Sequence, residues 1–151
     1  VLSAAAGADT VVLAEGDSTA SAWDVITNFT VANDGFDVST VPAALGAQAD
    51  LKSLDYDGDG VNDITVTSGY VTTTVGAIGG ADGKVTVAGM LAFLAANAKN
   101  ANDIYLFNAD TNGTAGIGAG DNTFAFQNLG TDLVVELVGA QATALTIADF
   151  V

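Results

Sequence analysis

Short stretches in which apolar and polar residues alternate dominate this chain, and they predict a mostly β structure. β-Branched residues are frequent in these stretches, and turn-forming Gly, Asp, Asn and Ser residues separate many of them, as is typical of strands. The expected strands lie at residues 9–14, 23–29, 36–41, 103–107, 122–127 and 132–138, and a hairpin is expected over 63–75 with its turn at Ser68 and Gly69.

Residues 86–99 follow a different period and predict a short amphipathic helix. Thr86 has a side chain that can cap the start of this helix. The apolar residues have the i, i+3, i+4 spacing of a helix within an Ala-rich run: Val87, Met90, Leu91, Leu94 and Ala95. A helix that covers the sheet is favoured over one that binds a membrane or a partner, because its polar side lacks the lysines of membrane-surface helices.

These elements together predict a mainly β fold, either a β-sandwich or a short β-roll-like stack, with one covering helix at about residues 86–99. The length of 151 residues fits a single β-rich, calcium-binding domain over 1–151 and is enough to bury a core. No apolar run reaches the roughly 18 residues that a transmembrane helix needs. The chain begins with Val1 and not with Met, so we expect a processed product or an excised segment.

The charge of the chain is strongly acidic. There are 18 acidic residues, of which 16 are Asp, against three lysines and no arginine, which gives a formal net charge of −15. Asp forms turns and is a compact metal ligand, so the bias indicates turns and cation sites. A solvated acidic surface of the kind found in halophiles is the alternative. Nucleic-acid binding is not expected, because the chain offers phosphates no basic patch.

The absence of Cys and His excludes further classes of chemistry. Without these residues the chain lacks thiol chemistry, the usual zinc and iron ligands and the commonest general base. No carboxylate is marked as held in an apolar pocket, and aromatic platforms for sugars are scarce, so we expect no enzyme. The cysteine-free, acidic composition suits a bacterial exported protein, and calcium near millimolar outside the cell would fill weak sites.

The segment Asp-Tyr-Asp-Gly-Asp-Gly-Val-Asn-Asp at residues 55–63 has the spacing of a cation-binding loop. Four aspartates stand at relative positions 1, 3, 5 and 9, with a glycine at position 6 for the sharp bend: Asp55, Asp57, Asp59, Asp63 and Gly60. Calcium is the natural ion because it accepts about six to eight oxygen ligands in flexible geometry. Val66 stands at position 12, where a helix-loop-helix calcium sensor has Glu, so we expect a structural calcium loop. A plain solvated acidic turn is the alternative.

Two further sets of residues are candidate calcium ligands. In the Gly-rich loop after residue 108, ligand-type residues occupy positions 1, 3, 5 and 12: Asp110, Asn112, Thr114 and Asp121. A metal-free β-loop is the alternative for this set. The other set stands at expected strand edges and turns and includes Asp24 and Asp37, together with Asp9 and Asp34. Here the alternative is that backbone amides satisfy turn-forming Asp side chains.

Several segments resemble the C-terminal modules of RTX-type, type I-secreted bacterial proteins. The N-terminal ones are Gly-Ala-Asp-Thr-Val-Val-Leu at 7–13, Trp-Asp-Val-Ile-Thr-Asn-Phe at 23–29 and Gly-Phe-Asp-Val-Ser at 35–39. The C-terminal ones are Thr-Asp-Leu-Val-Val-Glu-Leu-Val-Gly at 131–139 and Leu-Thr-Ile-Ala-Asp-Phe-Val at 145–151, so the resemblance touches both ends of the chain. The Gly-Gly-x-Gly-x-Asp nonapeptide repeats of the family's β-roll are absent. The resemblance implies a calcium-stabilised β-rich fold outside the cell and an uncleaved C-terminal secretion signal.

Two functional hypotheses follow. The first is an extracellular calcium-binding structural protein, an S-layer or self-assembling filament subunit that folds on calcium after export and pairs with copies of itself through the strands at 9–14 and 145–151. The second is a calcium-dependent adhesin domain that binds a cell-surface glycan or another ligand. The first expects Trp23 in the core, whereas the second expects Trp23, Tyr56 and Tyr70 exposed around a calcium-bridged pocket.

Overall fold

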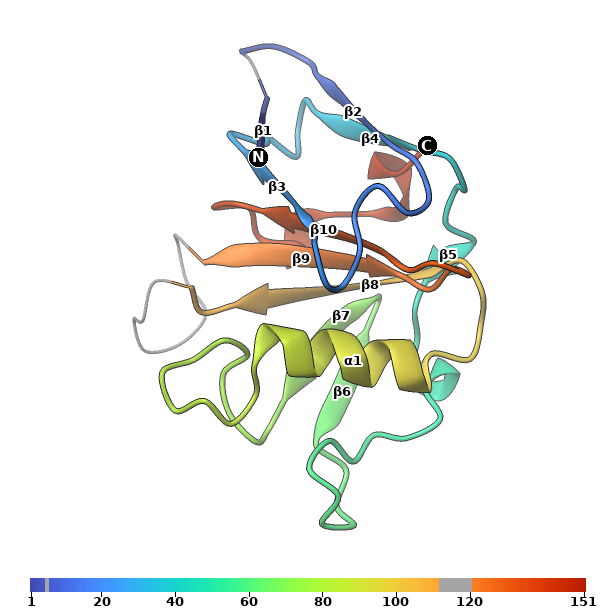
Figure 1. Ribbon diagram of the computed structural model, residues 1–151, viewed down its shortest axis with the longest axis vertical. Coiled ribbons are helices and arrows are strands. Elements are labelled where there is room, and N and C mark those ends of the chain that lie inside the picture. The colour runs from blue at the N-terminus through green and yellow to red at the C-terminus, as the bar shows by residue number, and fades with distance from the viewer. Residues whose placement is uncertain (5, 112–120) are drawn as a thin grey trace.

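The computed structural model describes residues 1–4, 6–111 and 121–151, and it shows a mainly β fold with one α-helix (Figure 1). The helix α1 spans Val87–Asn97, and Gln48–Asp50, Ala142–Ala144 and Ile147–Asp149 form short 3₁₀ turns. The strands of the described residues are β1 (Leu2–Ser3), β2 (Thr10–Leu13), β3 (Asp24–Thr27), β4 (Gly35–Val38), β5 (Ala44–Leu45), β6 (Ile64–Thr67), β7 (Tyr70–Thr73), β8 (Asp103–Ala109), β9 (Asn122–Gln127) and β10 (Leu133–Leu137).

Eight strands form one mixed sheet, and two form a small parallel sheet. The large sheet runs in the order β1-β3-β10-β9-β8-β7-β6, and β5 pairs with β8 beside this path. Its centre, β8-β9-β10, is antiparallel, whereas β3, β5 and β7 join it by parallel pairing. The small sheet pairs β2 with β4 over four residues. In Figure 1 this small sheet lies at the upper end, and α1 crosses the lower part of the large sheet.

The central strand β8 is buried along its whole length and divides the interior into two cores. Side chains alternate between the faces of a strand, so neighbouring residues of β8 enter different cores. Tyr105 and Phe107 belong to the first core, whereas Ile104 and Leu106 belong to the second. Both faces of the large sheet must therefore be covered.

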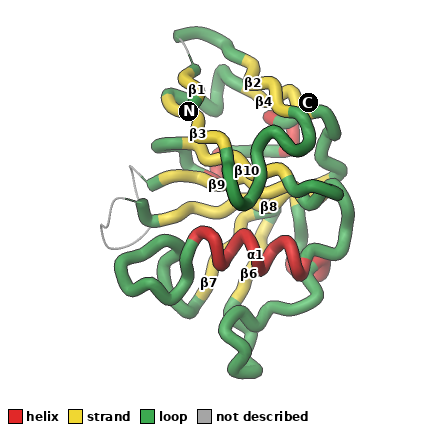
Figure 2. The backbone as a smooth tube through the Cα atoms, in the orientation of Figure 1, coloured by secondary structure: helices red, strands yellow, loops and turns green. Residues whose placement is uncertain are grey.

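Helix α1 covers the first core. Its buried residues Met90, Leu91 and Leu94 lie on one side of the helix and pack in the cluster that contains Phe107 of the sheet. The Thr86 hydroxyl caps the helix by accepting a hydrogen bond of 2.9 Å from the Gly89 N–H. The predicted covering helix is therefore confirmed, and α1 is the only α-helix of the described residues. Figure 2 shows it in red across the strands of the large sheet. No described helix has the length and hydrophobicity needed to cross a membrane.

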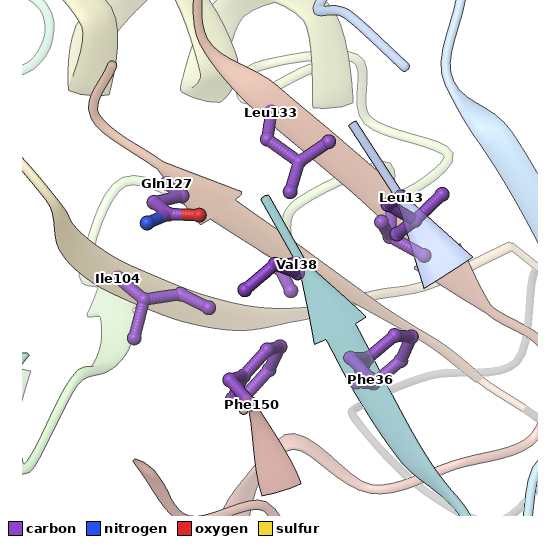
Figure 3. Close-up of a pocket in the computed structure, with 9 residues that line it drawn as sticks. Leu13, Phe36, Val38, Ile104, Gln127, Leu133 and Phe150 are labelled. Carbon is purple, nitrogen blue, oxygen red and sulfur yellow. The ribbon is translucent and has the colours of Figure 1, made fainter. Parts of the chain in front are cut away.

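The small sheet and the C-terminal residues cover the second core (Figure 3). Phe36 of β4 stacks between two other aromatic rings, with centroid distances of 4.7 Å to Phe29 and 5.0 Å to Phe150. A cavity of only ≈ 10 Å³ remains among Phe36, Phe150, Leu13 and their neighbours, at the lower limit for one water molecule. This space is packed interior and offers no room for a ligand.

The C-terminal residues do not form the free strand that was expected to pair with other copies of the chain. The Val151 N–H donates to the Phe36 carbonyl at 2.8 Å, and the Val38 N–H donates to the Val151 carbonyl at 2.9 Å. The end of segment 145–151 thus pairs with β4 of its own chain, and Phe150 is buried there. The reason is apolar burial, because the ring of Phe150 completes the aromatic stack of the second core.

The remaining expected elements agree with the structure. A strand overlaps each of the ranges predicted from alternation, although β4 ends at Val38, before the predicted end at 41, and β8 continues to Ala109. Ser68 and Gly69 turn the β6–β7 hairpin with φ angles of 48° and 78°. Such positive values at both central residues favour the close two-residue hairpin turn. The two-residue strands β1 and β5 are additions that the alternation pattern did not predict.

We expect Tyr105 to make the stability of the fold depend on pH in alkaline solution. Burial, with the negative charges of Asp103 and Asp50, raises the pKa of Tyr105 to about 12 from 10.0. A raised pKa in the folded state gives stability that is present below about pH 10 and is lost as the pH rises towards about 12, in total about 2–3 kcal/mol. Urea denaturation between about pH 9 and about pH 11.5 measures this loss.

The Tyr105→Phe variant is the control for this measurement, since it keeps the ring and removes the ionisable hydroxyl, which has no hydrogen-bond partner in its buried position. The two proteins differ in no other side chain. The free energy of unfolding should therefore fall less steeply with pH in Tyr105→Phe. Parallel pH profiles would contradict the prediction.

Candidate metal centre

The loop at 55–63 leaves and re-enters the fold at a narrow neck. The Asp63 N–H and the Ile64 N–H both donate to the Leu54 carbonyl, at 2.8 and 2.9 Å. Ile64, the first residue of β6, is buried in the first core. The loop is therefore attached to the interior at its base, and Figure 1 shows it at the lower end of the molecule beside β6.

The fold brings the four predicted carboxylates of this loop together. One carboxylate oxygen from each of Asp55, Asp57, Asp59 and Asp63 lies within 4.8 Å of the other three. Calcium binds oxygen at about 2.3–2.6 Å, so ligands on opposite sides of one ion lie about 5 Å apart. The four oxygens are thus as close as the ligands of a single calcium ion.

The loop backbone holds these carboxylates in place. The N–H groups of Gly58 and Gly60 donate to the two oxygens of Asp55, at 2.7 and 2.9 Å. Gly60 has a φ of 90°, a conformation that side chains with a Cβ resist, so the predicted bend at this position is confirmed. These hydrogen bonds also occur in acidic turns without a metal, so they establish the shape of the loop and not its ligand.

Asp63 differs from the other three because it is 7% exposed. Its Oδ2 accepts a hydrogen bond of 3.0 Å from the Tyr56 N–H, and the Asp57 N–H points to the same atom at 3.5 Å. Asp57 and Asp59 are exposed, and Asp55 is half-buried. The site therefore has one buried carboxylate at its base and two exposed ones at its open side.

Position 12 of the loop lies inside strand β6. Val66 occupies it, and its side chain is buried in the first core. A Glu at this position would point away from the four aspartates. Position 12 therefore adds no carboxylate to the cluster, whose side-chain oxygens all come from residues 55–63.

The electrostatics of the loop favour a bound cation. Two unit charges 4 Å apart repel by about 1 kcal/mol in water and by about 4 kcal/mol in the lower dielectric near a protein surface. Two of the three lysines have another role: Lys52 Nζ donates to the Ala96 carbonyl at 3.0 Å, and Lys99 Nζ donates to the Ala49 carbonyl at 2.7 Å. These ammonium groups tie the end of α1 to the segment before the loop.

The second candidate set is only partly described. The register of β8 and β9 pairs Ala109 with Asn122, so Asp110 and Asp121 face each other at the base of the following loop. Both residues are buried, with exposures of 6% and 0%. Asn112 and Thr114 lie outside the described residues. The structure thus places two of the four predicted ligands next to the adjoining ends of β8 and β9.

The third candidate set is dispersed. Asp24 lies on β3 of the large sheet, whereas Asp37 is exposed on β4 of the small sheet. Asp34 accepts hydrogen bonds from the Asp9 N–H at 2.9 Å and the Thr30 N–H at 2.7 Å, which is the turn role considered for this set. Among the described residues, only the loop at 55–63 groups three or more potential ligands closely enough for one ion.

The aromatic residues that an adhesin pocket would use are divided between the two cores. Trp23 is half-buried against the first core, and its Nε1–H donates to Glu136 at 2.7 Å. Tyr56 packs against Phe93 of α1, and Tyr70 packs against the second core. The sequence analysis missed the contact of Tyr56 with the helix. The available signal was the presence of an aromatic ring between two ligand positions, where a side chain that faces solvent would be expected to be polar.

Comparison of the chain with models of protein families, with curated proteins and with solved structures gave no match. The case for a function therefore depends on the chemistry of the loop.

We expect Asp63 to stabilise the protein even when no cation is present. Replacing Asp63 with Ala leaves the Tyr56 N–H without its acceptor at the base of the loop, which should cost about 1–3 kcal/mol of unfolding free energy. The measurement is urea denaturation in the presence of a chelator.

Asp59→Ala is the matched control because it removes the same charge from the exposed side of the loop. Its unfolding free energy should change by less than about 0.5 kcal/mol, or rise slightly as repulsion falls. Equal losses in the two variants would show that Asp63 has no special structural role.

Proposed function

We propose that this chain is an extracellular calcium-binding structural protein, an S-layer or self-assembling filament subunit that folds on calcium after export. One observation carries the proposal: four carboxylate oxygens lie within 4.8 Å of one another in a loop attached to the core. The ligands are all hard oxygens, which suit calcium and do not suit zinc or copper.

The expected affinity supports a role outside the cell. A bidentate Glu at position 12 is part of the tight helix-loop-helix sites, and Val66 in the core cannot replace it. Weaker calcium modules of extracellular proteins have dissociation constants of about 10⁻⁴–10⁻³ M. Such a site stays empty where calcium is scarce and fills where calcium is near millimolar. Calcium would therefore act on the chain only after export.

Binding at this loop would stabilise the fold as a whole. The neck joins the loop to β6, and β6 continues through β7 to the central strand β8. An ion that binds only the folded state shifts the equilibrium towards that state. At a calcium concentration of about 100 times the dissociation constant, the gain is about 2.7 kcal/mol.

The edge strand β2 supports self-assembly. In the small sheet β4 lies between β2 and the C-terminal residues, so one side of β2 faces away from the sheet. Val12 on this strand is 69% exposed. An edge strand with an exposed apolar side chain can pair with another strand, and the copies of this chain supply such a strand.

We expect a saturating concentration of calcium to raise the melting temperature by about 5–10 °C. This estimate multiplies the binding gain of about 2.7 kcal/mol by the shift of about 2–4 °C per kcal/mol that is typical of a chain of this size. The double variant Asp57→Asn/Asp59→Asn keeps the shape of the two side chains but removes two charges, so it should lose most of this shift. Thermal denaturation followed by circular dichroism, with calcium and with chelator, is the measurement.

Asp17→Asn/Asp82→Asn is the matched control, because it removes two exposed charges outside the loop. This variant should keep the full calcium shift. A similar loss in both double variants would mean that calcium only screens the net charge. A melting temperature of the unaltered chain that is the same with calcium and with chelator would refute the calcium site.

We also expect calcium to produce larger particles in dynamic light scattering. The variant Val12→Lys places a charge on the edge strand, a device that natural sheets use against edge pairing, and should remain monomeric in calcium. Its calcium-dependent melting shift should persist, since Val12 is outside the loop. A constant monomer of the unaltered chain would argue against assembly and favour the adhesin function.

A further inference from the structure

Tyr56 stands between two candidate ligands in sequence, but its side chain lies against helix α1. The ring centroids of Tyr56 and Phe93 are 5.6 Å apart with an angle of 48° between the rings. Both rings and Leu54 are partly buried against the first core. Burial also raises the pKa of the Tyr56 hydroxyl. The loop therefore has an apolar contact with the helix in addition to its neck.

The backbone of the same residue belongs to the carboxylate cluster. The Tyr56 N–H donates to Asp63 Oδ2 at 3.0 Å, and the flanking residues are Asp55 and Asp57. The Tyr56 residue therefore holds the anchored carboxylate through its backbone and contacts the helix through its ring. One residue connects the cluster to the helix.

Helix α1 has a complementary feature at Gly89. Glycine within a helix is less favourable than alanine by about 1 kcal/mol, so its presence in α1 needs a reason. A Cβ at this position would overlap the Tyr56 hydroxyl oxygen and would lie 2.9 Å from Thr86 Oγ1. The missing side chain of Gly89 is what lets Tyr56 lie on the helix.

From this geometry we propose that Tyr56 is a positioning residue that couples cation binding at residues 55–63 to the docking of helix α1. The inference rests on the proposed calcium site. An ion that draws Asp55, Asp57 and Asp63 together fixes the Tyr56 peptide and so holds the ring on α1. Conversely, the docked ring prearranges the ligands, because coupling between two events is reciprocal.

Calorimetric titration with calcium chloride tests the coupling from the side of the loop. Tyr56→Ala keeps all four carboxylates but should bind calcium at least about fivefold more weakly, in the range of measured couplings. Tyr56→Phe keeps the ring on the helix and should bind within about twofold of the unaltered chain. Leu145→Ala, a truncation in the second core, is the control for lost stability alone, and its calcium affinity should not change.

Gly89→Ala tests the coupling from the side of the helix. Alanine improves helix propensity, yet the added Cβ should displace the Tyr56 hydroxyl. A substitution outside the loop should therefore weaken calcium binding at the loop. Combining Gly89→Ala with Tyr56→Phe removes the overlap with the hydroxyl but keeps the close contact with Thr86 Oγ1. The double variant should therefore bind calcium more tightly than Gly89→Ala alone, by the part of the loss that acts through Tyr56. Hydrogen exchange supplies a second readout: calcium should slow exchange of the α1 amides in the unaltered chain and in Tyr56→Phe, but not in Tyr56→Ala.

The outcomes separate the coupling from the site itself. If the unaltered chain binds no calcium in the titration, the calcium site fails, and the coupling fails with it. If the unaltered chain binds calcium and Tyr56→Ala and Gly89→Ala bind it with the same affinity, the site stands and the coupling alone is overturned.

Discussion

The burial of strand β8 on both faces is the constraint on which the rest of the structure depends. A sheet exposes each side chain to one face or the other, so a wholly buried strand needs a cover on each side. The chain supplies two different covers: helix α1 on the side of Phe107, and the small sheet with the C-terminal residues on the side of Leu106. Segments far apart in sequence must therefore meet across β8.

This constraint also positions the acidic loop. The β6–β7 hairpin joins the large sheet through β7, which pairs in parallel with β8 at Tyr70 and Leu106. Parallel neighbours cannot be linked by a tight turn, and the connection from β7 to β8 contains α1. The loop before β6 consequently lies beside the helix that follows β7. The contact between Tyr56 and Phe93 is a result of that topology.

Alternation and spacing in the sequence were enough for the elements and for the loop, but not for their contacts. Ile64 and Val66 alternate with polar residues, so β6 was predictable, and the aspartate spacing alone indicated the cluster. β8 exposes no polar face, so its place at the centre of the sheet depends on partners that are distant in sequence. The burial of Asp63 and the contact between Tyr56 and Gly89 likewise arise from tertiary packing. No local pattern records them.

The separation between charges distinguishes one loop in a chain that is acidic throughout. The aspartates elsewhere on the surface are dispersed, and physiological salt screens charges beyond a Debye length of about 8 Å. The oxygens of the loop lie within 4.8 Å, well inside that length, so diffuse counterions reduce their repulsion only partly. An ion placed among them interacts with all four at once. The net charge thus gives a general dependence on salt, whereas a cation that entered the loop would neutralise its carboxylates directly.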